Sequence, residues 1–182
     1  MEKILELPFT LISRHISLRV QTDKDAEFIN TLYTSVRWQE LSATEWPEKL
    51  KHAFLDQQLT LQTRHYLSRY DSLWRGIILR RENPVGRLYL WRNGDDLRIV
   101  DLSLLPEQRC QGIGTQLLQT VIDQAARTGL GTSLHVQSGN PALALYQRLG
   151  FRSVEQDTSR QYQLMRHCPP LRTTGEQDVG SP

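Results

Sequence analysis

The sequence has little cysteine and no long apolar segment. Two cysteines, Cys110 and Cys168, stand among 182 residues, and neither belongs to a Cys-x-x-Cys or Cys/His pattern, which argues against a disulfide framework and a structural zinc site. A membrane-spanning helix needs roughly 20 apolar residues, whereas apolar runs such as residues 77–79 are far shorter. Glu2 and Glu6 lie where a secretory signal would be basic and then apolar. We therefore expect a cytoplasmic protein that binds no metal.

The chain also lacks a strong excess of charge of either sign. Lys plus Arg number 22 and Asp plus Glu number 20, for a formal net charge of +2. Proteins that bind phosphate backbones are usually far more basic, so scattered arginines alone give little support for nucleic-acid binding. With 38% hydrophobic residues, a chain of this length fits one core. We predict one domain over residues 1–168 and a disordered tail over residues 169–182, where apolar periodicity is missing.

Hydrophobic spacing predicts one strand and two helices in the N-terminal part. Residues 16–20 alternate apolar and polar side chains, as a half-buried strand does. Thr22 can cap a helix that runs to about residue 37. A second helix is predicted from Pro47 to about Tyr70. Its apolar side is expected to consist of Leu50, Ala53, Phe54 and Leu61.

The remaining chain alternates strands and helices. Three antiparallel strands are predicted over residues 74–80, 86–91 and 97–105, parted by turn-forming residues at 82–84 and 93–95. A helix opens at Gly112 and ends at Gly129. Its apolar positions repeat at helical spacing: Leu117, Leu118, Val121, Ile122 and Ala125.

A strand at residues 133–136 is followed by a helix from Asn140 to Gly150, and by strands near residues 151–155 and 161–165. The sum is an α+β fold: a mixed, mostly antiparallel sheet of six to seven strands with helices on both faces.

The most informative segment is the junction at residues 102–115, where a strand enters a glycine-containing loop and then a helix. Gly112 and Gly114 let a ligand approach the backbone, and the first helical amides point outward at the positive end of the helix dipole. Arg109 adds a positive charge and Thr115 a hydroxyl group. The junction suits a diphosphate, although the glycines could also serve only a tight turn. Leu117 at the third glycine position disfavours a Rossmann site, and the Gly-Lys-Ser/Thr of a P-loop is missing.

Two motifs in this order resemble the GCN5-related N-acetyltransferase superfamily. The first is Arg109-x-x-Gly112-x-Gly114 after a strand, and the second is Asn140-Pro-Ala-Leu-Ala-Leu-Tyr146-Gln-Arg-Leu-Gly150-Phe151. The resemblance spans roughly residues 16–165. It implies the three-layer fold of that superfamily, acetyl-CoA as the acyl donor, direct acetyl transfer to a primary amine, and the homodimers that its members often form.

The resemblance also implies which residues hold the cofactor. Asn140 would bond the pantetheine arm, and Tyr146 would lie near the sulfur. Cys110 stands where the family often has glycine, so its side chain must point away from the ligand, and we expect no catalytic role for it. Residues implied in binding the diphosphate or lining the pantetheine arm are Leu102, Ser103, Leu104, Arg109, Cys110, Gln111, Gly112, Ile113, Gly114 and Thr115.

Tyr146 is the candidate general acid. A phenol with a pKa near 10 is protonated at neutral pH and can donate a proton to the departing CoA thiolate. From spacing alone, core packing is the more usual role, because Tyr146 shares a helix face with Leu145 and Leu149. Asn140, which the resemblance places among the catalytic residues, could equally be a helix N-cap before Pro141.

The acceptor amine must lose a proton, and several groups could attract it. By family analogy, residues 37–46 cover the acceptor pocket, where Glu40 is the first candidate and Glu45 the second. Trp38 or Trp46 would add an aromatic wall. Each of these side chains could instead be solvated or packed under the loop.

Asp101 and His135 are further candidates. Strand alternation would place Asp101 on one face with Ile99 and Ser103, opposite Val100, Leu102 and Leu104, and His135 has a suitable intrinsic pKa. The main alternative to an enzyme is a non-catalytic acyl-CoA-binding sensor or interaction module. Protein N-termini, lysines, polyamines, aminoglycosides and amino acids are all compatible acceptors.

Overall fold

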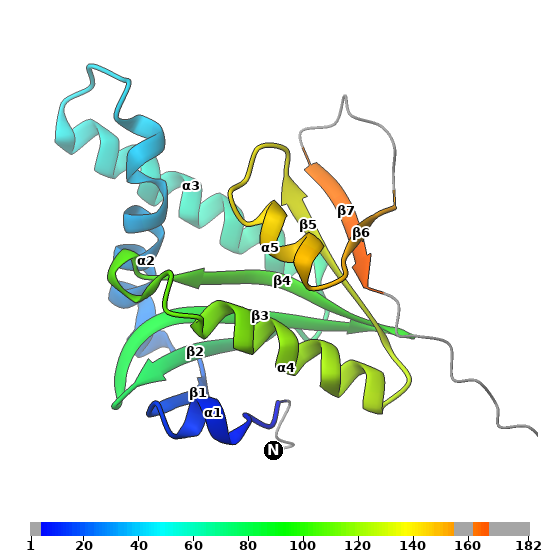
Figure 1. Ribbon diagram of the computed structural model, residues 1–182. Helices are drawn as coiled ribbons and strands as arrows, with labels where there is room; N and C mark the ends of the chain where they lie inside the picture. The colour runs from blue at the N-terminus through cyan, green and yellow to red at the C-terminus, as the bar shows by residue number, and fades with distance from the viewer. Residues whose placement is uncertain (1–4, 155–161, 168–182) are drawn as a thin grey trace, which may run out of the picture.

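The computed structural model describes residues 5–154 and 162–167 and consists of one seven-stranded sheet between helices (Figure 1). The strand order is β1-β2-β3-β4-β5-β7-β6. The strands are β1 (Ile16–Val20), β2 (Trp74–Arg80), β3 (Asn83–Asn93), β4 (Asp96–Leu104), β5 (Gly131–Gln137), β6 (Arg152–Ser153) and β7 (Tyr162–His167). The helices are α1 (Phe9–Ile12), α2 (Ala26–Arg37), α3 (Glu48–Arg69), α4 (Ile113–Arg127) and α5 (Leu143–Arg148), with short 3-10 turns η1 (Asp23–Asp25), η2 (Trp38–Leu41) and η3 (Pro106–Gln108).

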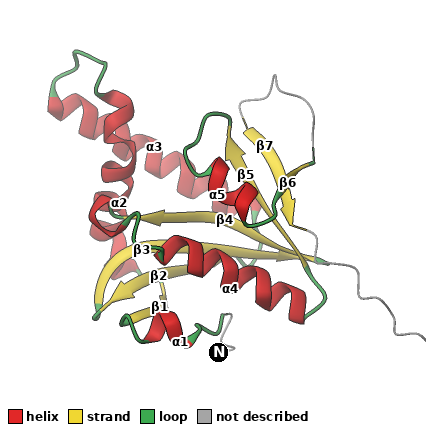
Figure 2. Cartoon of the chain, in the orientation of Figure 1, coloured by secondary structure: helices red, strands yellow, loops and turns green. Residues whose placement is uncertain are grey.

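Helices cover both faces of the sheet, as the sequence predicts (Figure 2). On one face, α1 and α4 pack on the central strands, and the apolar side of α5 joins the same core. On the other face, α2 contacts β3 and β4 and packs against α3. The described helices include none long and apolar enough to cross a membrane.

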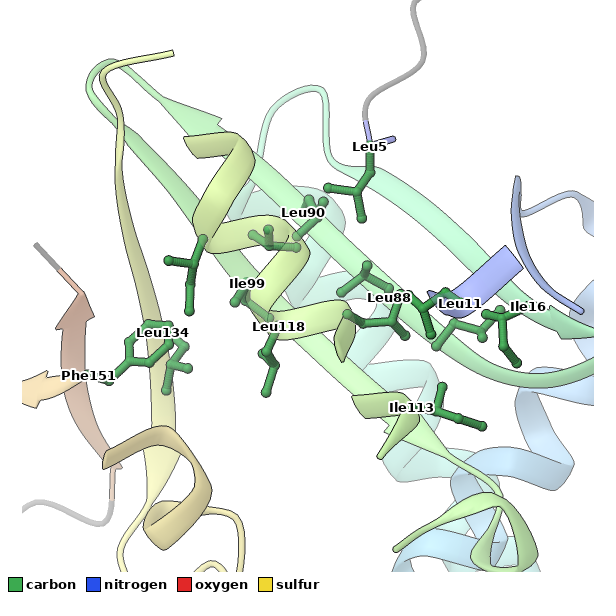
Figure 3. Packing of buried hydrophobic residues seen from close by; sticks show 14 of the residues in the cluster. Leu5, Leu11, Ile16, Leu88, Leu90, Ile99, Ile113, Leu118, Leu134 and Phe151 are labelled. Carbon is green, nitrogen blue, oxygen red and sulfur yellow. The ribbon is translucent and has the colours of Figure 1, made fainter. Parts of the chain in front are cut away.

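The main core lies under α4. Its five predicted apolar positions are all at most 4% exposed, which confirms the helix and its buried face. Figure 3 shows this core extending along the sheet, with Leu11 of α1 toward one end and Phe151, the residue before β6, at the other. This core fixes α4, and with it the glycine loop, against β4.

Strands β4 and β5 pair in parallel only at their beginnings. The pairing runs from Asp96 with Gly131 to Ile99 with Leu134 and then stops. Figure 1 shows the ends of these two strands pointing apart. Both strands continue for several residues past the last pair, so a gap opens between residues 100–104 and residues 135–137.

A β-bulge at Val100 changes which residues of β4 share a face. Tyr89 pairs with Asp101 and Leu90 pairs with Ile99, so Val100 is the extra residue. Ile99 therefore lies on the core face with Leu102, not on the face of Asp101. Strict alternation is wrong at this point, because a bulge shifts the side-chain period by one residue.

The expected apolar side of α3 is also wrong. Leu50 is 50% exposed and Leu61 is 48% exposed, while Leu55 is the buried apolar residue of this helix. The side that faces the sheet also carries Gln62 and Tyr66. Polar residues occupy this inner face because α3 closes a cavity there. The apolar residues Leu50 and Leu61 lie on the solvent side of the helix instead.

The turn between β2 and β3 is shorter than expected. Arg81 and Glu82 have φ of +48° and +69° and form a two-residue turn between Arg80 and its partner Asn83. Pro84 lies inside β3 next to a bulge, where a missing N–H is tolerated. The last two strands pair as predicted, whereas positions 155 and 161, Cys168 and the tail at 169–182 lie outside the described residues.

Gly86 holds β3 close to β4, and we expect Gly86→Ala to destabilise the protein by about 1–3 kcal/mol. A Cβ here would overlap the backbone oxygen of Ser103 and lie 2.7 Å from Leu104 Cδ2. Gly131→Ala is the matched control, because its Cβ would meet Asp96 Oδ1 at an ordinary 3.6 Å. Urea denaturation measures the free energy of unfolding of both variants. Equal losses of stability in the two would contradict the close approach of β3 and β4 at Gly86.

The start of α2 depends on a buried carboxylate. Asp25 accepts hydrogen bonds from Arg19 at 2.6 and 2.8 Å and from the Thr22 amide at 2.7 Å. The bonds from Arg19 lower the pKa of Asp25 far below its usual range. Its contribution to stability is therefore present above the unfolded-state pKa of about 3.9 and is lost as pH falls below that value.

We accordingly expect Asp25→Asn to be less stable than the parent at pH 7, with the difference shrinking as pH falls below about 4. Chemical denaturation across this range measures it. A difference that is constant with pH would show that the carboxylate charge is not what stabilises this turn.

Candidate active site

A cavity of about 230 Å³ lies at the gap between β4 and β5. The ends of both strands line it, and α2 and α3 close it from the second face of the sheet. The strand before the first motif reaches it through Leu102 and Ser103, and the second motif reaches it through Asn140 and Tyr146. The cavity thus joins the two segments that the sequence analysis assigned to one ligand.

The glycine loop beside this gap presents unpaired amides. Within residues 5–154, no backbone carbonyl accepts a hydrogen bond from the amides of residues 110–115, and Gln116 donates to Gly112 O at 3.0 Å. Gly112 has a φ of +78°, and Cys110 is also left-handed with a φ of +56°. A loop with this many free N–H groups at a helix N-terminus is suited to bind an anion.

Arginines surround this loop and brace it. Arg80 Nη1 donates to the side-chain oxygens of Gln108 and Gln111 at 2.9 and 2.8 Å. Arg109 Nε donates to Leu104 O at 2.9 Å. Arg14 Nη1 lies 3.9 Å from the position of a Cβ on Gly112. The loop therefore carries positive charge as well as free amides.

The side chains of the glycine loop and the first turn of α4 differ in their exposure to solvent. Ile113 is 1% exposed and packs in the core, so only its backbone can meet a ligand. The Thr115 side chain is exposed. The thiol of Cys110 is exposed and free.

Tyr146 and Asn140 both line the cavity. The Tyr146 ring packs edge-on against Phe151 with centroids 6.0 Å apart. Burial, and then the negative charge of Asp101, raise the pKa of Tyr146 to about 12. Asn140 Oδ1 accepts a hydrogen bond from the Ala142 amide at 2.8 Å, so the residue caps the turn that leads into α5 while it lines the cavity.

Asp101 lies at the centre of a buried polar network. Its carboxylate accepts hydrogen bonds from Arg87 Nη2 at 2.7 Å, from Ser103 Oγ at 2.7 Å and from Tyr66 Oη at 3.3 Å. Arg87 Nη2 also donates to Gln62 Oε1 at 2.8 Å. Arg87 and Asp101 side chains are 4% and 9% exposed, so this ion pair is shielded from solvent.

Burial and the charge of Asp101 set the protonation of the network. Both raise the pKa of Tyr66 well above its ordinary value, so this phenol stays neutral. Burial lowers the pKa of Arg87, but the charge and hydrogen bond of Asp101, together with Tyr89 and Tyr66, more than offset it and leave that pKa raised. The network therefore holds one fixed cation and neutral phenols around the carboxylate.

The model of the Acetyltransferase (GNAT) family matches residues 35–151, which contain both motifs and the cavity strands. The chain belongs to this family. It is thus an enzyme of the N-acetyltransferase class, and the sheet with its helical layers is the fold that the sequence resemblance implies.

Solved structures similar to this acetyltransferase share its fold. The PaiA N-acetyltransferase from Thermoplasma acidophilum in complex with coenzyme A is 17% identical, with a TM-score of 0.62 over 85% of this chain and 99% of that one. An acetyltransferase from Thermus thermophilus is 21% identical, with a TM-score of 0.60 over 84% and 96%. The ribosomal-protein-S18-alanine N-acetyltransferase from Escherichia coli is 18% identical, with a TM-score of 0.54 over 89% and 97%. No curated protein matches the sequence.

The loop expected to hold the acceptor contributes little to the cavity of this GNAT protein. Glu40 is 56% exposed and pairs with Arg37 at 3.0 Å, and it does not line the cavity. Glu45 is exposed as well. Trp38 packs at a tilt against His52, and Trp46 packs edge-on against Phe54, with centroids 4.8 and 5.4 Å apart. Neither indole lines the cavity.

Asp101 and His135 do line it, from β4 and β5. Sequence reasoning missed their neighbours Arg87, Gln62 and Tyr66. A signal was present for Arg87, because a charge interrupts the buried run of β3. The described residues include no group of three or more His, Cys, Asp and Glu side chains that could hold a metal ion.

Proposed function

We propose that this chain transfers the acetyl group of acetyl-CoA directly to a primary amine while both substrates are bound. The observation that carries the proposal is the gap between β4 and β5 beside the unpaired amides of residues 110–115. Together they give room for an extended chain and a binding place for a diphosphate.

The residues present fit acetyl-CoA in the following way. The amides of the glycine loop would bind its diphosphate, helped by Arg14 and Arg109. Leu102 and Ser103, on the open edge of β4, would line the pantetheine arm, and Asn140 would donate its side-chain N–H₂ from the opposite side. Acetyl-CoA supplies the reactive thioester, and the chain orients it at the cavity.

Tyr146 is assigned as the general acid. When the amine nitrogen bonds to the acetyl carbon and the carbon–sulfur bond breaks, the phenol gives its proton to the sulfur. A pKa of about 12 keeps the phenol protonated at neutral pH, as a proton donor must be.

Asp101, rather than Glu40, is assigned to the acceptor amine. Its carboxylate lines the cavity, whereas Glu40 is outside the lining and paired with Arg37. Asp101 would accept an N–H of the incoming amine and receive the proton that the nitrogen releases, directly or through a water. His135, on the facing strand, is the second group able to take that proton.

Calorimetric titration with acetyl-CoA and with CoA tests the cofactor site, followed by a thiol-release assay with a broad set of primary amines. We expect micromolar binding and CoA release that depends on an amine. No binding would overturn the proposal. Tight binding without turnover of any amine would instead favour a non-catalytic acyl-CoA sensor.

A further inference from the structure

Arg87 has hydrogen-bonding capacity that the protein does not use. Its guanidinium lines the cavity with 4% of the side chain exposed, and Nη2 makes both of its hydrogen bonds. Among the described residues Nε has no acceptor and is fully buried, and the guanidinium carbon lies 5.1 Å from the centroid of the Tyr89 ring. Guanidinium N–H groups left unpaired away from water are costly. Because the guanidinium lines the cavity, an oxygen supplied by a ligand would add a partner for this incompletely paired cation.

The cavity also has more positive than negative charge. Its charged lining residues are Arg37, Arg87 and Asp101, so two guanidiniums face one carboxylate. Asp101 is already neutralised by Arg87 at 2.7 Å. Arg37 is therefore the positive charge that no carboxylate of the cavity lining neutralises.

Arg37 is held in position at the cavity wall. Its guanidinium lies 5.9 Å from the centroid of the Tyr33 ring, which lines the same cavity. Its other partner, Glu40, is 56% exposed, and an ion pair as exposed as this one is weak. An anion that enters from the cavity can replace Glu40 at little cost.

From these charges we infer that the acceptor is a small amine that also carries a carboxylate, such as a free amino acid. The inference rests on the proposed function and names its substrate class. The amine would lie at Asp101, and the carboxylate would bind Arg37 and the cavity-facing side of the Arg87 guanidinium. Polyamines and aminoglycosides fit poorly, because each further ammonium would meet a guanidinium without a free carboxylate. A cavity of about 230 Å³ favours a small molecule over a folded segment.

Binding of the acceptor to the CoA complex tests the inference without relying on turnover. The protein saturated with CoA is titrated with standard amino acids, with β- and γ-amino acids, with the matching carboxamides and decarboxylated amines, and with short peptides that begin with the same residues. We expect at least one acid to bind about tenfold or more tightly than its carboxamide. The same order is expected in kcat/KM for acetyl transfer. At neutral pH the less basic amine of a carboxamide has the larger uncharged, nucleophilic fraction, so amine basicity alone would give the opposite order in kcat/KM.

Arg37→Met keeps the length of the side chain and removes its charge. We expect it to abolish the preference for the acid while the Kd for acetyl-CoA stays unchanged, and Arg37→Lys to retain part of the preference. Arg64→Met, on the exposed side of α3, is the matched control and should keep the full preference. Arg87 is unsuitable for this test, because its loss would leave Asp101 buried without a cation.

Three outcomes would overturn the inference while leaving acetyl-CoA binding, and so the proposed cofactor site, intact. They are equal binding of acids and carboxamides, a preference for polyamines, and acetylation of peptides alone. A chain that fails to bind acetyl-CoA would instead show that the proposed function itself is wrong, and the inference would fall with it.

Discussion

Tyr146→Phe is expected to lower kcat for amine acetylation by about 10²–10⁴-fold, the usual contribution of a positioned general acid. The substitution removes one hydroxyl and keeps the ring that packs against Phe151. Stability and the Kd for acetyl-CoA should therefore change little, and steady-state kinetics together with calorimetry measure the two effects separately. A variant with the parent kcat would contradict the role of Tyr146.

Tyr70→Phe is the matched control for this loss. Tyr70 follows α3, packs against Trp91 with centroids 5.1 Å apart, and does not line the cavity. Removing its hydroxyl should leave kcat unchanged. Equal losses in both variants would mean that a general effect of the substitution, rather than a proton from Tyr146, explains the result.

The pH dependence gives a second measure of the same proton. Because burial and Asp101 raise the pKa of Tyr146 to about 12, the protonated form persists from neutral pH to well above pH 10. Deprotonation of Tyr146 should therefore cause no fall in the kcat of the parent on the alkaline side, up to the highest pH at which the protein stays folded. Any alkaline fall that is seen should be present in Tyr146→Phe as well. A fall with an apparent pKa below about 10 that vanishes in the variant would show an ordinary phenol at this site.

Sequence pattern predicted both helices, but it identified the buried face of α4 correctly and that of α3 wrongly, and the cavity explains the difference. The inner face of α4 packs on a continuous core, so apolar spacing identifies it. The inner face of α3 includes Gln62 and Tyr66, which bond the Arg87–Asp101 network. A rule that equates buried with apolar must fail where a helix closes a polar site.

The position of Asp101 needed the structure for a different reason. The residue was a candidate from the sequence, but its orientation depends on the bulge at Val100, and an extra residue in one strand leaves no periodic signal. Glu40 illustrates the opposite case. The expected loop contains the helical turn η2, and the Glu40 carboxylate pairs with Arg37 three residues before it. This pairing follows from the spacing only when the segment is known to be helical, and the sequence predicted a loop.

Gly112→Asp is expected to weaken acetyl-CoA binding by about a hundredfold or more. A carboxylate at this position would lie among the free amides of residues 110–115, occupy the space of the diphosphate and repel its charge. The backbone φ of +78° adds strain for any side chain. Calorimetric titration with acetyl-CoA measures the loss, and thermal unfolding measures the strain.

Gly129→Asp separates these two effects, because it places the same side chain at the same kind of backbone position at the other end of α4. Gly129 has a φ of +74°, and nothing lies within 4 Å of its Cβ position. Both variants should lose stability, since both force a left-handed aspartate, but Gly129→Asp should keep the parent affinity for acetyl-CoA. If both lose affinity equally, α4 is merely destabilised and its N-terminus is not the diphosphate site. If only Gly112→Asp loses it, the free amides at this end of the helix bind the cofactor.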